Sequence, residues 1–513
     1  MSNTVFMLLG LTLRAMVYGD SSGTTHPFGW LEPRDIIPCV NKDKGYLVVG
    51  EYRLDPSDPT RDLGDIFMLR LDSLLNIVWF KVVGSYPAEE IGLQVIQLPE
   101  LDSGFFICGS TLSDGSSNLV YLRTNPEGDV LWAYEYPGFY LGSDLSSVMS
   151  KDPAGSQVAI VGARRIGSQL NLAICCVNLP NGSIAWERDY ADNSFAHLIG
   201  TNISRAPQEG TLYVTGVYSD DVYQNSIFRA AFTREGAAVL WATACTTTIS
   251  LLPISIQMID DTTYYVLTER ASVPSATEVL KCTRNSVSWI QGFQNFDGHY
   301  AKVFSDGSLV ITGVSTTNTN NHVCLVLDST GGFKWANLYS VAFGRAVCES
   351  PTGIITSAGS SNLGLIGLLD CSVIQMPLST GFYPGCLSAT GFTPTAPSYF
   401  WRDLTLVGQG SVYSPTRLTW SSGPISLKRD SLCTTLYENI EEKEMFRKPN
   451  ILPLLVPNGI CFFATEPQIL SLYSPTGALI HRENLVVGKN LIILPQGVYL
   501  WQAGPYKGKA VVR

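Results

Sequence analysis

Tryptophan recurs at nearly constant intervals through the first two thirds of the chain. Each copy closes an apolar segment that follows a polar turn, as in "RTNPEGDVLW" and "LDSTGGFKW". The intervals between successive copies are 53, 54, 55, 48 and 46 residues. Periods of this length are typical of propellers and solenoids. The six copies are Trp79, Trp132, Trp186, Trp241, Trp289 and Trp335.

A second marker, an apolar segment that ends in glycine, keeps the same phase. The fifth copy, "TTYYVLTE", has lost the glycine. Alternating apolar residues, β-branched and aromatic side chains, and turns rich in Gly, Asn and Asp predict four short strands in each repeat. The glycines are Gly50, Gly109, Gly162, Gly216, Gly313 and Gly359.

Four antiparallel strands per repeat indicate a propeller blade. The seventh repeat runs from "GRAVCES" to "GLIGLLDCSVIQM", with Ile374 at the tryptophan position. One blade cannot bury both faces of its sheet, so neighbouring blades must cover each other. Residues 26–378 therefore predict an all-β, seven-bladed propeller, in which the tryptophans pack between blades rather than stack on a ligand.

The composition limits the classes of partner. At 513 residues the chain exceeds one ordinary core, which is consistent with a large repeat domain followed by smaller ones. Charged residues make up 15%, against about 25% in an average soluble protein. A net charge of −10 without basic clusters argues against nucleic acid and anionic membranes as partners.

The N-terminus carries a short apolar run, Val5 to Leu13. It is too short to span a bilayer, so no transmembrane segment is predicted, but it suits the core of an export signal. We expect residues 1–19 to be a signal peptide. The alternative is a buried strand.

Beyond Met376 the repeat ends. Residues 379–437 are rich in Ser, Thr, Pro and Gly and are bounded by Cys386 and Cys433. In an exported chain this spacing suggests a disulfide around a small β segment, worth about 2–4 kcal/mol, and the alternative is two unpaired thiols. Residues 438–450 carry the densest run of charge and are interpreted as a solvated linker.

The last segment, 451–513, predicts a small β-sandwich. Its "ILSLYSPTGALI", "GKNLIILPQGVYLW" and final "GKAVV" resemble the C-terminal sorting domain of type IX secretion substrates in Bacteroidota. The repeat with its D-x-x-G-x-x-x-W turns also looks like that of secreted Bacteroidota propellers. The matching sorting positions are Gly477, Gly497, Tyr499, Lys509, Val511 and Val512.

This resemblance implies a route. The chain would cross the inner membrane, the type IX machinery would recognise the tail at the outer membrane, and the protein would be released or anchored at the surface. The alternative is an ordinary C-terminal sandwich used for binding.

Motifs for catalysis are sparse. There is no G-x-S-x-G, no phosphate-binding glycine loop and no pair of histidines at metal-ligand spacing. The turn motif resembles the tryptophan-docking repeat of quinoproteins, which also use adjacent cysteines, as in Cys175-Cys176. These two lie mid-strand, however, where successive side chains point to opposite faces.

One acidic loop could bind Ca²⁺, because it holds carboxylates at short spacing. A solvated loop is the better interpretation, since no bidentate Glu is suitably placed, and we expect no cofactor. The four carboxylates are Asp55, Asp58, Asp62 and Asp65.

The sequence thus predicts a secreted or surface-bound, non-catalytic propeller for adhesion or binding. We expect it to contact an extracellular glycan or protein through loops 55–65, 113–117 and 219–225. Two alternatives remain open. One is a propeller enzyme, quinoprotein-like or glycoside-acting, and the other is a structural subunit of a surface assembly.

Overall fold

The computed structural model divides the chain into two compact units, Met1–Thr434 and Thr435–Arg513, and each is described by itself. Within 1–378 it describes all residues except 1–14, 21–29, 41–43, 54–63, 85–87, 114–115, 142–147, 153, 193–196, 220–225, 237, 246–249, 271–275, 317–321, 340–342, 351–353 and 362–369. From 379 onward it describes the strands given below, with Ser474.

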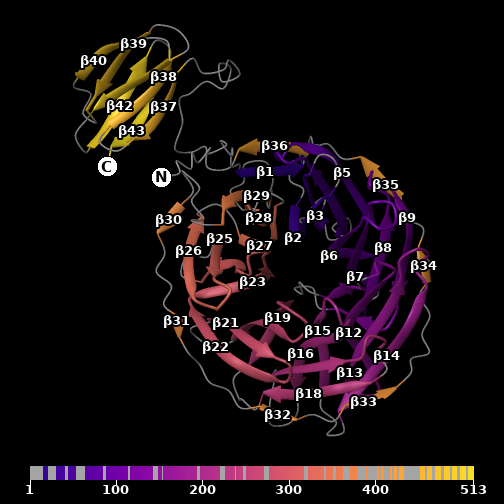
Figure 1. The fold of residues 1–513 in the computed structure, drawn as a ribbon. Coiled ribbons are helices and arrows are strands. Elements are labelled where there is room, and N and C mark those ends of the chain that lie inside the picture. Colours follow the sequence, from indigo (N-terminus) through magenta and orange to yellow (C-terminus); the bar gives the residue numbers. More distant parts are fainter. Residues whose placement is uncertain are drawn as a thin grey trace. The chain divides into compact units, whose positions relative to one another are not determined.

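The first unit is a ring of seven antiparallel sheets, which confirms the all-β, seven-bladed propeller (Figure 1). Blade 1 is made of β2 (Trp30–Pro38), β3 (Tyr46–Arg53), β4 (Asp65–Leu71) and β5 (Ile77–Gly84). Blade 2 is made of β6 (Glu89–Leu98), β7 (Gly104–Ser113), β8 (Ser116–Thr124) and β9 (Val130–Tyr136). Blade 3 is made of β10 (Phe139–Tyr140), β11 (Met149–Lys151), β12 (Gln157–Ile166), β13 (Gln169–Asn178) and β14 (Ile184–Asp192).

The next three blades follow the same order from the channel outward. They are made of β15 (His197–Arg205), β16 (Leu212–Ser219), β17 (Ser226–Phe232) and β18 (Val239–Cys245); β19 (Leu251–Met258), β20 (Thr263–Arg270), β21 (Ala276–Thr283) and β22 (Ser286–Gln294); and β23 (Phe296–Val303), β24 (Leu309–Ser315), β25 (His322–Leu327) and β26 (Phe333–Tyr339).

Blade 7 is closed by the N-terminus of the chain. Its first three strands are β27 (Phe343–Glu349), β28 (Ile354–Ser361) and β29 (Asp370–Pro377), and the fourth is β1 (Ala15–Asp20). The sequence predicted Ile374 at the tryptophan position, which lies on the fourth strand. This prediction is wrong, because Ile374 lies on the third strand, where it pairs with Ala15 of the fourth. The boundary expected after residue 19 also cuts through β1, which belongs to the propeller.

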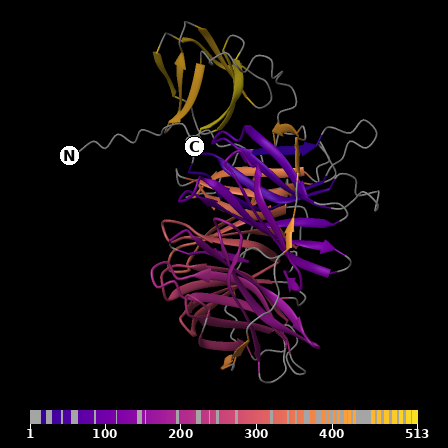
Figure 2. The ribbon, with the colours of Figure 1, turned by 90° about the vertical axis from the view of Figure 1, so that its right-hand side faces the viewer.

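Seven short strands between residues 387 and 431, here called the outer belt, add one further strand to each blade. The sequence set 379–437 apart from the propeller, but the belt strands pair with the fourth strands of blades 6, 5, 4, 3, 2, 1 and 7, in that order. They lie on the outer rim of the ring (Figures 1 and 2). Covering this edge satisfies backbone groups that would otherwise be open to another chain. The belt consists of β30 (Leu387–Ala389), β31 (Pro394–Thr395), β32 (Trp401–Asp403), β33 (Leu406–Gln409), β34 (Thr416–Leu418), β35 (Ser421–Pro424) and β36 (Leu427–Ser431).

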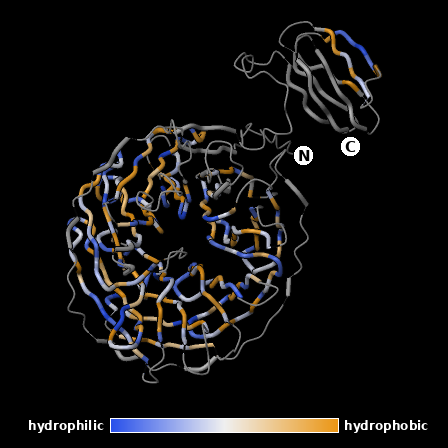
Figure 3. Tube along the Cα trace, turned by 180° about the vertical axis from the view of Figure 1, so that it is seen from behind, coloured by the Kyte–Doolittle hydropathy of each residue, from blue (hydrophilic) through white to orange (hydrophobic). Residues whose placement is uncertain are grey.

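Apolar residues are spread through all the blades rather than gathered in one part of the ring (Figure 3). The buried clusters span neighbouring blades. One joins Val49 and Met68 of blade 1 to Phe105 of blade 2, and another joins Ile227 of blade 4 to Val266 of blade 5. Both faces of each sheet are therefore covered, as repetition of blades requires.

The tryptophans sit at these same interfaces, against the turn of the following blade. A Cβ placed on Gly236 of blade 4 would lie 2.5 Å from Cζ3 of Trp186 in blade 3. Gly236 has a φ of +63°, which L-residues rarely adopt. Glycine is therefore favoured here for two reasons, because it allows this backbone conformation and leaves room for the tryptophan ring. The pairs Trp79 with Gly128 and Trp289 with Gly331 repeat this arrangement.

A β-bulge interrupts the innermost strand of six blades at the same place. It displaces the carbonyl of the residue two before the bulge toward the second strand. A Cβ on Gly313, for example, would lie 1.9 Å from the oxygen of Asp297. The glycine-ended segment in the sequence is thus the partner of this bulge. The bulged residues are Arg34, Leu93, Thr201, Ile254, His299 and Arg345.

The residue after the bulge often links its blade to the next. Asp35 Oδ2 accepts the backbone N–H of Val95 at 2.9 Å, and Asn202 Nδ2 donates to the carbonyl of Pro253 at 3.0 Å. Complete burial raises the pKa of the Asp35 carboxyl group to about 6, although the hydrogen bond from the backbone of Val95 lowers this pKa. Polar bonds therefore tie the inner strands together around the channel.

The second unit contains two antiparallel sheets. One has the order β37-β38-β41 and the other β40-β39-β42-β43. The predicted sandwich of these two sheets stays a prediction. Their strands are β37 (Ile451–Val456), β38 (Gly459–Ala464), β39 (Gln468–Tyr473), β40 (Leu479–Leu485), β41 (Gly488–Ile493), β42 (Gly497–Ala503) and β43 (Tyr506–Val512).

The contact between tryptophan and turn glycine predicts a stability difference between two alanine variants. Gly167 has a φ of +64°, close to that of Gly236, but nothing lies within 4 Å of a Cβ placed on it. Gly167→Ala should cost about 1–2 kcal/mol of unfolding free energy through its backbone alone. Gly236→Ala should cost that amount and about 1–3 kcal/mol more, because the methyl group overlaps Trp186. Guanidinium unfolding of the full chain, followed by tryptophan fluorescence, measures both, and equal losses would contradict this contact.

Candidate functional site

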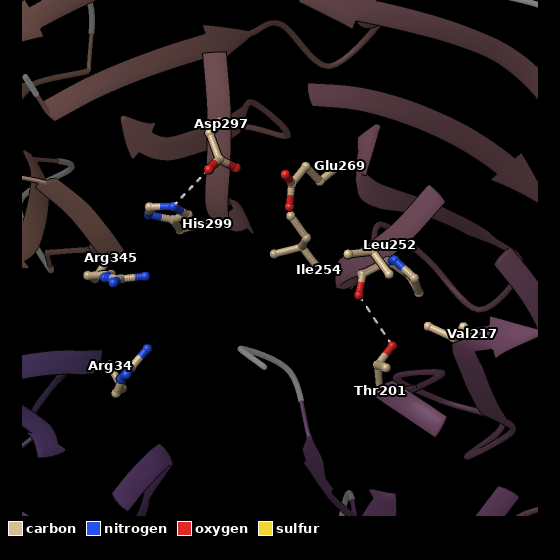
Figure 4. Close-up of a pocket in the computed structure, with 10 residues that line it drawn as sticks. Arg34, Thr201, Val217, Leu252, Ile254, Glu269, Asp297, His299 and Arg345 are labelled. Atoms are coloured by element: carbon tan, nitrogen blue, oxygen red, sulfur yellow. Dashed lines mark hydrogen bonds and ion pairs between the residues drawn. The ribbon is translucent and has the colours of Figure 1, made fainter. Parts of the chain in front are cut away.

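A pocket of about 400 Å³ lies inside the ring, lined by the inner strands of blades 1 and 4 to 7 (Figure 4). Bulges re-aim side chains relative to a regular strand, and here they repeat around the channel. Five of the six bulged residues line this pocket. They are Arg34, Thr201, Ile254, His299 and Arg345.

Two arginines form the basic side of the pocket. Glu32 Oε1 lies 3.4 Å from Nη2 of Arg34 and 2.6 Å from Nη2 of Arg345, so one carboxylate bridges both guanidinium groups. Glu32 is only 6% exposed, and it anchors the two side chains from behind. Figure 4 shows a nitrogen of each guanidinium directed into the ring. Arg34 Nη2 also lies 3.8 Å from Oε2 of Glu51, so a second carboxylate contacts this guanidinium.

The next part of the lining carries carboxylates. Asp297 belongs to β23 and Glu269 to β20, and Figure 4 shows Asp297 beside His299, which separates it from Arg345. His299 Nε2 lies 3.5 Å from Asp297 Oδ2, and its Nδ1 lies 2.8 Å from the carbonyl oxygen of Gly344. Because a carbonyl only accepts, Nδ1 carries the proton of this bond. Asp297 Oδ1 is buried and has no hydrogen-bond partner within the described part of the chain.

The remaining wall is aliphatic. Val217 of β16 and Leu252 and Ile254 of β19 line it, with the hydroxyl of Thr201 beside them. Thr201 Oγ1 lies 3.3 Å from the carbonyl oxygen of Pro253. The pocket thus has a cationic, an anionic and an apolar side, each supplied by different blades.

A buried histidine lies beneath the pocket. A Cβ on Gly344 would lie 2.6 Å from Cδ2 of His322, so this ring packs directly under the backbone that holds His299. His322 Nε2 lies 3.0 Å from Ser357 Oγ, and Ser357 donates to the carbonyl of Ala346 at 2.9 Å. Burial lowers the pKa of His322 to about 3, so the imidazole is neutral.

The strand ends that flank the loops expected to bind ligand lie on one edge of the blades. Loops 55–65, 113–117 and 219–225 each join the second strand of a blade to the third. The pocket is lined near the ends of second strands, by Val217 and Glu269, and near the starts of first strands. Antiparallel order places these ends on one edge of the sheets.

The acidic loop is described only at its end. Asp55, Asp58 and Asp62 lie outside the described residues. Asp65 begins β4, and burial raises the pKa of its carboxyl group to about 6. Within the described ranges there is no group of three or more His, Cys, Asp or Glu side chains arranged to hold a metal ion.

Cys175 and Cys176 do not line the pocket. Cys175 and Cys176 are buried in the middle of β13, and burial raises the pKa of both thiols. Cys386 and Cys433 lie outside the described residues, so the predicted disulfide stays a prediction.

Of the sorting positions, Gly477 lies outside the described residues as well. The others lie on β42 and β43, with Gly497 paired to Val512, Tyr499 paired to Ala510, and Lys509 and Val511 in the same ladder. Among the described residues no helix is long and apolar enough to cross a membrane.

Sequence analysis missed every residue of the pocket. The sequence does contain a pattern that marks the bulges, because Gly or Pro precedes each bulged residue, as in "IGLQV", "DGHYA" and "FGRAV". In five of the six bulged blades this residue also pairs with the glycine of the second strand, as Gly298 does with Gly313. In the remaining blade Pro253 pairs with Thr268.

Comparison with known proteins finds low similarity to solved structures. No family model matches the sequence, and no curated protein matches it. The propeller of Dos1 covers 71% of this chain and 95% of its own, with a TM-score of 0.42 and 9% identity. An intramolecular trans-sialidase from Ruminococcus gnavus covers 71% and 99%, with a TM-score of 0.37 and 10% identity. The quinohemoprotein alcohol dehydrogenase ADHIIG from Pseudomonas putida HK5 covers 71% and 78%, with a TM-score of 0.37 and 9% identity.

The buried histidine predicts a pH dependence. The folded pKa of about 3 lies below the ordinary value of 6.5, so the unfolded chain binds more protons between these values. The stability that His322 contributes is fully present above pH 6.5 and is lost as the pH falls toward 3. The difference in unfolding free energy between wild type and His322→Gln should shrink by about 1.4 kcal/mol per pH unit below 6.5. Chemical unfolding at pH 7, 6, 5 and 4 measures it, and a constant difference would show that His322 is not held neutral.

Proposed function

We propose that this protein is a secreted, non-catalytic binding propeller that is displayed on the cell surface and takes its ligand at the pocket inside the ring. The observation that carries the proposal is the set of five bulged residues that converge on one pocket. Propellers bind through loops and the channel, and here the second strands end near the pocket, as Val217 and Glu269 show. A ligand would therefore be held by the inner strands and reached by the segments that follow the second strands.

The proposed lack of catalysis rests on how the polar groups of the pocket are used. Glu32 holds Arg34 and Arg345, and Asp297 faces His299. Cys175 and Cys176, the pair that suggested a quinoprotein, are buried inside blade 3 and do not line the pocket. These groups are arranged to hold and orient a ligand rather than to attack one.

The proposed export role rests on the tail. Thr435–Arg513 is a compact unit of its own, and its last two strands carry five of the six sorting positions. A unit that is separable from the ring is suited to act as an address, because it can be recognised without disturbing the blades.

The binding proposal predicts that one channel substitution abolishes ligand binding. Ile254→Trp adds a large ring at a bulged position and should fill the pocket. Ligands that raise the unfolding temperature of the wild type in a screen of glycans, peptides and metabolites should leave this variant unchanged. Circular dichroism and the ligand-free unfolding temperature control for folding. Retained binding by a folded variant would rule out the pocket, and turnover of a bound ligand, seen by mass spectrometry, would overturn the non-catalytic assignment.

The sorting proposal predicts the location of a truncated chain. In a Bacteroidota host with a type IX system, the chain without residues 451–513 should stay inside the cell envelope, while the full chain reaches the exterior. Deletion of residues 438–450 alone is the matched control and should leave export intact. Cell fractionation and surface proteolysis measure the location. Export of the truncated chain would refute the sorting role.

A further inference from the structure

The chemistry of the pocket is divided around the ring. Cationic groups come from the adjacent blades 7 and 1, through Arg345 and Arg34, and carboxylates come from blades 6 and 5, through Asp297 and Glu269. Figure 4 shows the two pairs on neighbouring parts of the same lining, with His299 between them. A ligand that satisfies both sides must carry an anionic and a cationic group on the same small molecule.

Partial burial strengthens the electrostatic interactions of these charged side chains with a ligand. The side chains of Arg34 and Arg345 are 10% and 25% exposed, and that of Asp297 is 27% exposed. Charged groups sheltered from water interact more strongly than the same groups on an open surface. The buried Oδ1 of Asp297, which has no hydrogen-bond partner in the described part of the chain, offers an acceptor on the anionic side.

The third side sets the remaining chemistry of the ligand. Val217, Leu252 and Ile254 present branched aliphatic groups. Among the described residues the lining holds no Phe, Tyr or Trp, so it lacks the broad apolar ring faces on which sugars stack. A volume of about 400 Å³ suits a molecule the size of an amino acid or a dipeptide, at the lower end of ordinary ligand pockets.

We propose that the pocket binds a zwitterion with an aliphatic side chain, either a free amino acid or a short peptide. Its carboxylate lies against Arg34 and Arg345, its ammonium against Asp297 and Glu269, and its side chain against the aliphatic wall. This inference rests on the binding function proposed for the pocket and names the class of ligand.

Calorimetric titration of the full chain tests the match between the groups of the ligand and the sides of the pocket. The probes are L-leucine, the dipeptide Leu-Leu, 4-methylpentanoate, which lacks the ammonium, and 3-methylbutylamine, which lacks the carboxylate. Leucine or Leu-Leu should bind, and loss of either charged group should weaken binding at least about tenfold. Whichever of the two binds more tightly identifies the source as a free amino acid or a peptide.

Two variants should show opposite effects. Asp297→Asn should weaken leucine binding about tenfold and leave 4-methylpentanoate binding unchanged, because that probe has no ammonium. Arg345→Gln should weaken leucine and 4-methylpentanoate and leave 3-methylbutylamine unchanged. Asp306→Asn, which removes an acid 3.6 Å from Lys334 outside the pocket, is the matched control and should change nothing. Unfolding temperatures confirm that each variant is folded.

Several results would overturn the inference. These are failure of both zwitterions to bind, equal binding of a probe that lacks one charge, or equal effects of both variants on all probes. If Ile254→Trp blocks some other ligand while no zwitterion binds, the binding function stands and the ligand class is wrong. If that variant blocks no ligand at all, both fail.

Discussion

A Cβ on residue 313 would lie 1.9 Å from the carbonyl oxygen of Asp297, and the equivalent overlap recurs at Gly50, Gly109, Gly216 and Gly359. The cause is the bulge in the innermost strand, which moves this carbonyl out of the regular ladder. One irregularity has three effects. In five of the six bulged blades it favours glycine in the second strand, because a Cβ there would overlap the displaced carbonyl. It also turns one side chain into the channel and places the next residue where it can reach the neighbouring blade.

The third effect explains why polar groups are buried at the inner rim. Asp35 and Asn202 each bond to the backbone of the following blade, so the inner strands are joined by directional bonds as well as by apolar contact. Toward the rim, the tryptophan and the turn glycine of the next blade have the same role. Each blade is thus fixed to its neighbour at two radii, and the pocket between the inner strands keeps a defined shape.

Much of the ring could be predicted from sequence, because its signals are local and repeated. The tryptophan period identified the blades, and the glycine marked the second strands. Three features were missed for physical reasons. The fourth strand of blade 7 comes from residues 15–20, and its pairing with β29 joins segments that lie more than 350 residues apart in sequence. The belt strands are two to five residues long and carry no period of their own. The pocket depends on single residues after Gly or Pro, which are Arg in two blades and Leu, Thr, Ile and His in the other four, so no repeated letter marks them.

The outer belt changes how a pull on the chain would be borne. Its strands are attached to blades 6, 5, 4, 3, 2, 1 and 7 in chain order, and β36, the last of them, pairs with the N-terminal strand β1. Force that enters from residues beyond 431 meets β36 first and reaches β35, β34 and the others only after each ladder before it has opened. Each belt strand is held by few hydrogen bonds, so the belt strands detach one at a time. Each detachment lengthens the free chain, while the four-stranded blades stay paired. If the protein is held by its tail, the belt strands unpair under force before the blades do, and the ring keeps its fold.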